Sequence, residues 1–168
     1  MREGEGPVMA VYVARAFMLG LLLVACAAPA RAQNTAEAFT PLIGCWRAVA
    51  DEPGLTDELC FERLGAHVVA LQRRGDGAMG ETTFHDDDAG GIIFAHADAA
   101  GARANGVLRA EGDRFVLAPH TLIAADGRTS RLRGSWVLEA SSTLTITMDE
   151  ENEGRWRAGS PITYQRAP

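Results

Sequence analysis

The sequence has no lysine, few aromatic residues and only three cysteines. All 16 basic residues are arginine, and 22 acidic residues bring the formal net charge to −6. No basic run is longer than Arg73-Arg74, and this acidic balance argues against binding to nucleic acid, which needs a basic surface. Hydrophobic residues make up 47% of the 168 residues, so the composition predicts one folded domain rather than a disordered chain.

The usual motifs of nucleophilic catalysis and phosphate binding are also missing. The sequence contains no G-x-S-x-G, no S-x-x-K and no glycine-rich loop that leads into a helix. We therefore predict that the protein is not an enzyme and that it carries no cofactor.

One long apolar run is present, over residues 16–29, and it is too short to span a bilayer comfortably. Arg15 precedes this run, and Ala30-Arg31-Ala32 follows it at once. A basic start, a short apolar core and an A-x-A site together predict a secretory signal peptide over residues 1–32. The rest of the chain then divides into an N-terminal segment, residues 33–43, and a domain, residues 44–168.

A second interpretation of the N-terminus stays open. Leu23-Val24-Ala25-Cys26 resembles the lipobox of bacterial lipoproteins, in which the cysteine is lipidated after cleavage. Residues 27–38 would then form a tether. The first interpretation predicts a periplasmic or secreted protein, and the second predicts a lipoprotein anchored in the outer membrane.

Cys45 and Cys60 remain in the mature chain, and an oxidising compartment favours a disulfide between them. Residues 51–57 contain a Pro-Gly turn, so the flanking residues are expected to pair as an antiparallel hairpin. The register that joins the cysteines also sorts their neighbours by chemistry. It places opposite each other Arg47 and Glu58, Trp46 and Leu59, and Gly44 and Phe61.

Beyond residue 44 the apolar residues alternate with a period of two, which is typical of half-buried strands. The predicted strands are residues 44–50, 58–64, 67–74, 79–86, 91–98, 105–111, 114–120, 130–139, 143–149 and 155–166, the last broken at Gly159-Ser160-Pro161. The clearest hairpin turns at Gly112-Asp113, and the hairpin of residues 131–149 needs an odd-length loop near Ser141. Short connections leave no room for crossover helices, so neighbouring strands must be antiparallel. We predict an all-β, antiparallel up-and-down barrel of about 8–10 strands, preceded by a short N-terminal helix over residues 35–43.

The two ends of this predicted barrel resemble the calycins, the group that includes the lipocalins. Gly44-Cys45-Trp46 follows a short helical turn as a G-x-W motif, and Ile162 to Arg166 forms the last strand. The resemblance implies a lipocalin-like barrel in which Trp46 plugs the base and Arg166 packs across it. The opening residues also resemble uncharacterised exported bacterial families with lipocalin-like domains.

Several polar residues have the side-chain types found in metal, acid–base or haem sites. His85-Asp86-Asp87-Asp88 has metal-ligating groups, but the following Gly90-Gly91 favours a turn, and we expect no metal site. His96 should lie within about one residue of Glu81 across a hairpin, as an exposed contact rather than an acid–base pair. His67 and His120 stand alone at strand ends, where a surface or capping role is expected rather than haem ligation.

Two further charged runs have simple explanations. Arg74-Gly75-Asp76 spells an adhesion tripeptide but continues into Gly77 as a plain turn. Asp149 to Glu153 is expected at a solvated hairpin tip rather than in a cation site.

These observations predict an exported binding protein that holds a small apolar ligand in its barrel. An open apolar cavity is expected around Phe61, Phe115 and Trp136. The candidate lining residues are Trp46, Phe61, Leu108, Phe115, Trp136 and Ile146. Two alternatives remain: a protein-binding barrel, such as a periplasmic peptidase inhibitor that uses residues 33–43, and an envelope-maintenance domain without a small ligand.

Overall fold

The computed structural model describes residues 34–49 and 57–168, which all belong to one compact unit of the chain, Ala32–Pro168. The predicted signal peptide, and Cys26 with it, lies outside the described residues. The described part starts with the short helix α2 (Thr35–Ala38) and the 3-10 turn η1 (Thr40–Leu42). Asn34 caps α2, because its side-chain oxygen accepts the Glu37 N–H at 3.2 Å.

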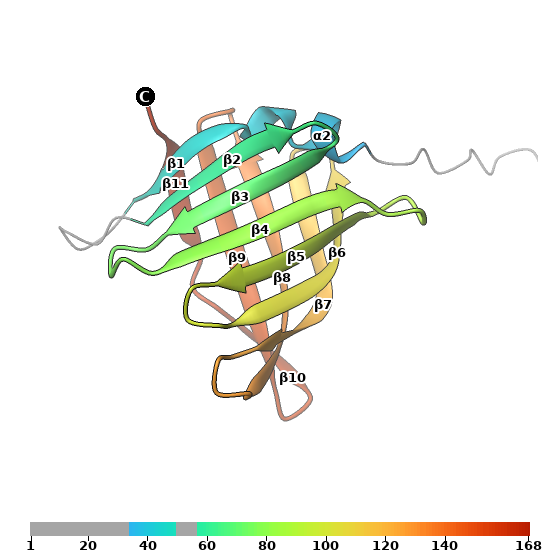
Figure 1. Ribbon diagram of the computed structural model, residues 1–168, viewed down its shortest axis with the longest axis vertical. Coiled ribbons are helices and arrows are strands. Elements are labelled where there is room, and N and C mark those ends of the chain that lie inside the picture. Colours follow the sequence, from blue (N-terminus) through green and yellow to red (C-terminus); the bar gives the residue numbers. More distant parts are fainter. Residues whose placement is uncertain (1–33, 50–56) are drawn as a thin grey trace, which may run out of the picture. The chain divides into compact units, whose positions relative to one another are not determined.

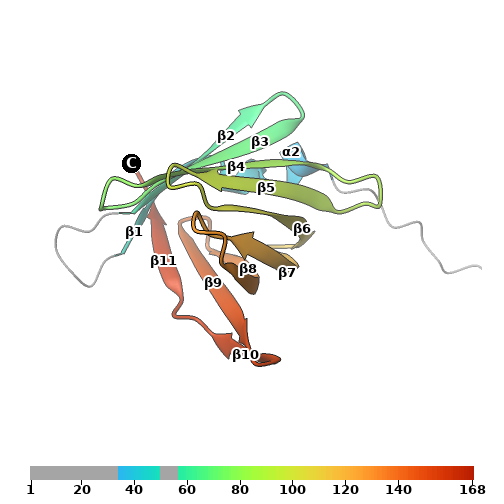
Figure 2. The same ribbon diagram turned by 60° about the horizontal axis from the view of Figure 1, so that its bottom comes forward.

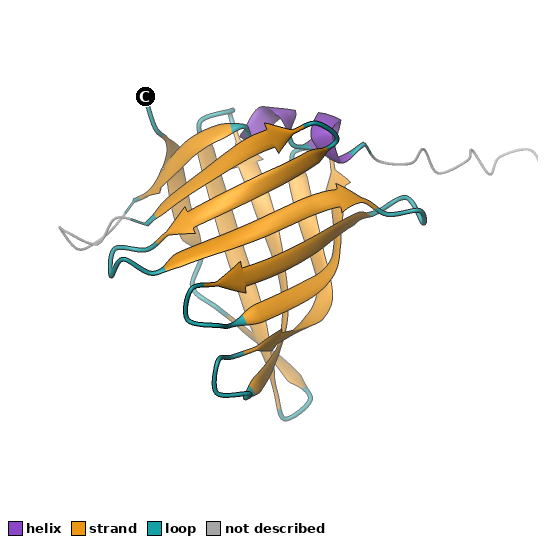
Figure 3. Cartoon of the chain, viewed as in Figure 1, coloured by secondary structure: helices purple, strands orange, loops and turns teal. Residues whose placement is uncertain are grey.

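Strands follow in an unbroken series (Figures 1 and 3). They are β1 (Gly44–Ala48), β2 (Glu58–Leu64), β3 (His67–Arg73), β4 (Met79–Asp86), β5 (Ile92–Asp98), β6 (Arg103–Glu111), β7 (Arg114–Ile123), β8 (Thr129–Glu139), β9 (Thr143–Asn152), β10 (Arg155–Ala158) and β11 (Ile162–Arg166). Each pairs with the next in antiparallel fashion as far as β9, and β11 pairs with both β9 and β1. The sheet therefore closes into an all-β barrel of ten strands, as the sequence predicts.

Strand β10 lies outside the closed ring. Strand β9 pairs with β11 through Thr143–Ile146 and with β10 through Asp149–Asn152. Both strands thus follow the same edge of β9, one after the other (Figure 2). The break between them falls at residues 159–161, where the sequence predicted it, and the Gly159 N–H donates to the Met148 carbonyl at 3.0 Å.

Several strands are longer than predicted. Strand β6 begins at Arg103, β7 continues to Ile123 and β9 continues to Asn152. Register shifts between Asn105 and Leu108 and between Leu117 and His120 interrupt the two-residue alternation, which hid the extensions of β6 and β7. Because β9 continues to Asn152, the acidic run that starts at Asp149 lies mostly within β9, and the turn follows it at Glu153 and Gly154.

The barrel has two distinct ends. Strand β1 starts directly after η1, so the end where β1 begins is called the helix end, and the opposite one is the far end (Figure 3). Because neighbouring strands are antiparallel, the described connections at the far end include residues 74–78, 99–102, 124–128 and 153–154. Nearly the whole hydrophobic core lies toward the helix end, including residues Phe39 and Leu42 of the N-terminal segment.

Candidate functional site

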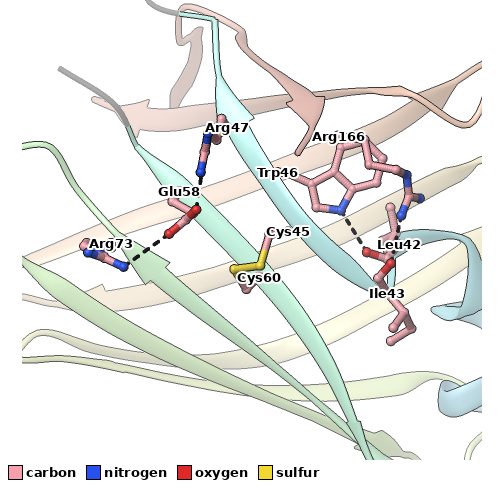
Figure 4. The surroundings of a disulfide bond; sticks show 9 residues. All are labelled: Leu42, Ile43, Cys45, Trp46, Arg47, Glu58, Cys60, Arg73 and Arg166. Atoms are coloured by element: carbon pink, nitrogen blue, oxygen red, sulfur yellow. Dashed lines mark hydrogen bonds and ion pairs between the residues drawn. A yellow bond between two sulfur atoms is a disulfide. The ribbon is translucent and has the colours of Figure 1, made fainter. Parts of the chain in front are cut away.

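Trp46 and Arg166 close the helix end of the barrel (Figure 4). Trp46 is fully buried, and its indole Nε1–H donates to the Leu42 carbonyl at 2.8 Å. The Arg166 guanidinium carbon lies 4.3 Å from the centroid of the indole, which is a cation–π contact. Arg166 also donates to the backbone carbonyls of Ile43 and Ser141, so it ties the first strand, the last strand and a hairpin loop together. The predicted position of both residues is confirmed.

The Cys45–Cys60 disulfide joins β1 to β2 in the predicted register (Figure 4). Glu58 lies opposite Arg47, with their charged atoms 3.5 Å apart, and also accepts from Arg73 at 3.3 Å. A disulfide of this kind indicates that the chain folds in an oxidising compartment.

Phe39 fills the space inside the barrel where the sequence predicts a ligand cavity. Its ring centroid lies 5.9 Å from that of Phe61, 5.0 Å from that of Phe115 and 6.3 Å from that of Trp136. It also lies 4.6 Å from the ring of Phe84. These are ordinary distances for packed aromatic rings, so the N-terminal segment supplies the apolar occupant of the helix end.

The six predicted lining residues fall into two groups. Trp46, Phe61, Leu108 and Phe115 are at most 1% exposed, so they form the packed core. Trp136 and Ile146 face each other across β8 and β9, pack against that core and are only half-buried. Within the predicted set, solvent reaches these two.

Asp86 holds the start of the N-terminal segment against the barrel. The Thr35 N–H donates to the Asp86 carboxylate at 2.6 Å. Hydrogen bonding from Thr35 lowers the pKa of Asp86, and the nearby His67 and His85 add to the effect against the opposing cost of burial. The neighbouring Asp87 forms the predicted turn, and no cluster of three metal-ligating side chains occurs among the described residues.

Burial falls from the helix end to the far end along several strands. Alternate residues of a strand share a face. Successive inward-facing positions are Val68, Ala70 and Gln72 on β3, Ile92, Phe94 and His96 on β5, and Leu144, Ile146 and Met148 on β9. The first residue of each series is fully buried, and the last is half-buried. Side chains therefore fill the helix end, while solvent enters the barrel from the far end.

Glycines keep bulky side chains against the wall of this far half. A Cβ at Gly80 would lie 3.1 Å from Cε1 of His96, and one at Gly106 would lie 2.8 Å from Cε1 of Phe94. A Cβ at Gly134 would overlap the Met148 sulfur. A glycine inside a strand weakens it, so each has a packing reason here: a neighbouring side chain lies flat across it.

His96 is the main polar group on one side of the far half. Its Nδ1 and the Thr82 hydroxyl share a hydrogen bond of 2.9 Å. Burial lowers the pKa of His96, Asp98 opposes this shift and Arg74 adds to it, so the imidazole is neutral near pH 7. His96 thus lies opposite Thr82, one position from the predicted neighbour Glu81.

Tyr164 stands on β11 across from Leu144 and is 2% exposed. Burial raises the pKa of Tyr164 to about 12, with Asp57 adding to the shift and Arg74 opposing it. Arg74 therefore acts on both Tyr164 and His96, although it belongs to the turn at residues 74–78, where Gly77 donates to its carbonyl. The tripeptide that begins at Arg74 forms the predicted turn.

The other histidines have their own protein contacts. His67 is exposed, and its ring centroid lies 6.1 Å from that of His85. His120 is buried, donates from Nδ1 to the Ala118 carbonyl at 3.0 Å, and packs edge-on against Phe94. The surface position predicted for His67 is confirmed. The surface or capping role predicted for His120 is wrong, because β7 continues past it to Ile123 and its ring is buried against Phe94.

A pocket of about 450 Å³ lies on the outer wall, over β7, β8 and β9. Val116, Ser135 and Thr147 form a row of small side chains across it. Arg133 borders the pocket, pairs with Asp149 at 3.0 Å and stacks over Trp156 at 4.6 Å. Arg133, one of the two arginines at this pocket, is thus already held by protein groups.

Comparison with known proteins supports the fold. No protein-family model matches the chain, and no curated protein matches its sequence. Among solved structures the chain is similar to the crystal structure of Rv2717c from M. tuberculosis, with 17% identity and a TM-score of 0.54. The similarity covers 84% of this chain and 99% of that one, and at this identity it shows a shared fold alone. No helix in the described residues has the length and apolar character to cross a membrane.

The sequence did not indicate that Phe39 fills the helix end of the barrel or that the far half carries polar side chains. Phe39 stands in a segment with too few residues to show helical periodicity. The mid-strand glycines at residues 80, 106 and 134 were the available sign of the far half, because a strand seldom keeps glycine without a packing or binding reason.

Proposed function

We propose that this chain is an exported, non-enzymatic binding protein that takes a small ligand into the far half of its barrel. The observation that carries this proposal is the difference in burial along single strands, from fully buried Val68, Ile92 and Leu144 to half-buried Gln72, His96 and Met148. The calycin resemblance of Gly44, Trp46 and Arg166 supports it, because that group of barrels binds ligands in the interior.

The ligand would meet two kinds of wall. Trp136, Ile146 and Met148 offer half-buried apolar surface, and Ile162 next to Ile146 is 43% exposed. Thr82 and His96 offer neutral polar groups on the other side. Partly apolar walls with a few placed polar groups are typical of small-molecule sites.

Export is part of this proposal. The disulfide supports an oxidising compartment, and the residue pattern before Gln33 supports cleavage after Ala32 or lipidation of Cys26. Mass spectrometry of the mature protein would separate these: a chain that starts at Gln33 supports soluble export, and a lipidated Cys26 supports an anchor.

The peptidase-inhibitor alternative meets an obstacle in the N-terminal segment. Thr35, Ala36, Phe39 and Leu42 are at most 2% exposed. A reactive segment must be presented to the protease, whereas this one is packed into the barrel. The structure therefore gives no specific support to that alternative.

A matched pair of substitutions tests the proposed site. Ala104 faces inward beside His96, whereas Asn105 is exposed on the outer face. Ala104→Phe should abolish binding of the neutral dye N-phenyl-1-naphthylamine, and Asn105→Phe should leave it unchanged. Binding that survives Ala104→Phe, or no binding by the unaltered protein, would overturn the proposal. Native mass spectrometry of protein from its own periplasm would look for the natural ligand.

A further inference from the structure

Trp136 belongs to an aromatic layer that crosses the barrel. Its ring centroid lies 6.0 Å from that of Phe61 on β2 and 5.8 Å from that of Phe84 on β4. Strands β2 and β4 are far from β8 in the order of the ring, so the indole reaches across the interior rather than along its own wall. Phe39 and Phe115 complete the layer, at 6.3 Å and 6.1 Å from Trp136.

Trp136 is the one member of this layer that is not fully buried. The four phenylalanines are at most 1% exposed, whereas Trp136 is half-buried. The helix-end side of the layer is filled by Phe39 and Leu42, so the exposed part of the indole faces the far half. The next inward position on β8 toward the far end is Gly134, and the Met148 side chain lies flat across it, against the wall.

An indole held at the bottom of a solvent-filled space favours a particular ligand shape. Aromatic rings gain most from flat partners in stacked or edge-on contact. The indole cannot turn away, because it is packed against rings on several sides. Above this floor, the Thr82–His96 pair supplies neutral hydrogen-bonding groups.

We propose that the ligand is a flat aromatic or polycyclic molecule that stacks on Trp136 and hydrogen-bonds through one edge to Thr82 and His96. This inference rests on the proposed function, and it adds the chemical class of the ligand. Trp136 then selects ligands that are flat, and His96 selects ligands that carry a polar group at one edge.

The test compares a flat probe with a flexible one. N-phenyl-1-naphthylamine and dodecanol are titrated, the second by displacement of the first, against the unaltered protein and Trp136→Leu. The substitution should weaken the naphthylamine about tenfold, because a stacked aromatic contact is lost, and should change dodecanol affinity less than about twofold. Trp156→Leu, on the outer wall, is the matched control and should change neither affinity.

A second variant keeps the test decisive if Trp136→Leu does not fold. His96→Phe retains a flat ring over Gly80 and removes the hydrogen bond to Thr82. The unaltered protein should prefer 2-naphthol to naphthalene by about fivefold, the effect of one net hydrogen bond, and His96→Phe should remove that preference.

The outcomes separate the two proposals. If Ala104→Phe blocks both probes but Trp136→Leu weakens them equally, or the naphthol preference survives in His96→Phe, the barrel binds a ligand and the flat-ligand inference is wrong. If Ala104→Phe blocks neither probe, the proposed function itself fails.

Discussion

The two ends of this barrel are built from the same strands and yet differ in nearly every property. At the helix end, Phe39 and Leu42 fill the interior, and Trp46 and Arg166 tie the first and last strands to the turn η1 that precedes β1. At the far end, inward-facing side chains are polar or half-buried, and glycines let the bulky ones lie against the wall. The difference indicates that packing at one end supplies stability, so the other end need not be packed and is the place of the proposed binding site.

The largest effect is expected at Trp46. Trp46→Ala should lower the free energy of unfolding by about 3–5 kcal/mol, because it removes a fully buried indole, its hydrogen bond to Leu42 and its contact with Arg166. Trp156→Ala, which removes an indole from the outer wall, should cost less than about 1 kcal/mol. Urea unfolding of both variants measures the contrast, and equal losses would show that the helix end has no special role.

Phe39→Ala tests the contrast between the two ends by removing the ring that fills the helix end. The loss should be about 3 kcal/mol, because a fully buried ring leaves a cavity among Phe61, Phe84 and Phe115. An apolar cavity of this kind stays dry and accepts small aromatic molecules. The variant should therefore gain protection by benzene in thermal unfolding. Thr40→Ala, at an exposed position, is the control and should gain none.

Reduction of the disulfide should destabilise the chain by about 3 kcal/mol, because the closed loop between Cys45 and Cys60 constrains the unfolded state. Thiol titration of the unreduced mature protein should find neither of these two thiols free. Dye binding under mildly reducing conditions should persist as long as the barrel stays folded, since the disulfide lies outside the far half. A loss of dye binding without unfolding would contradict the separation of the two ends.

The smallest effect is expected at Asp86. Its pKa is lowered in the folded chain, chiefly by hydrogen bonding from Thr35, so its contribution is present above the ordinary pKa of 3.8 and is lost as the pH falls toward the lowered value. Because Asp86 is exposed, Asp86→Asn should cost no more than about 1 kcal/mol at pH 7. The difference between variant and unaltered protein should shrink at pH 3. A difference that grows in acid would show that Asp86 does not hold the segment in this way.

Local pattern predicted the parts of the fold that depend on two neighbouring strands. The Cys45–Cys60 register followed from the sorting of charges and apolar residues, and the hairpin at Gly112-Asp113 formed with Glu111 opposite Arg114. The bulge near Pro119 escaped prediction, because it breaks the alternation on which strand assignment rests.

The interior was harder to predict, since it depends on which strands meet across the barrel. Phe61, Phe115 and Trp136 were expected to line one space, and they do approach each other. Nothing local indicated that Phe39 occupies that space, because its four ring contacts come from four different strands and all lie more than twenty residues away in sequence. Because Phe39 fills the space where a ligand was expected, the proposed site lies in the far half instead.

One substitution made at both ends tests the central claim most directly. Ala70 is 4% exposed at the packed end of β3, and Ala104 faces inward at the far end beside His96. Ala70→Phe should lower the free energy of unfolding by about 1–3 kcal/mol or more, because a ring is forced into a filled core. Ala104→Phe should change it by less than about 1 kcal/mol, because the ring enters solvent-filled space. Equal destabilisation at the two positions would show that the far half is packed and would contradict the account.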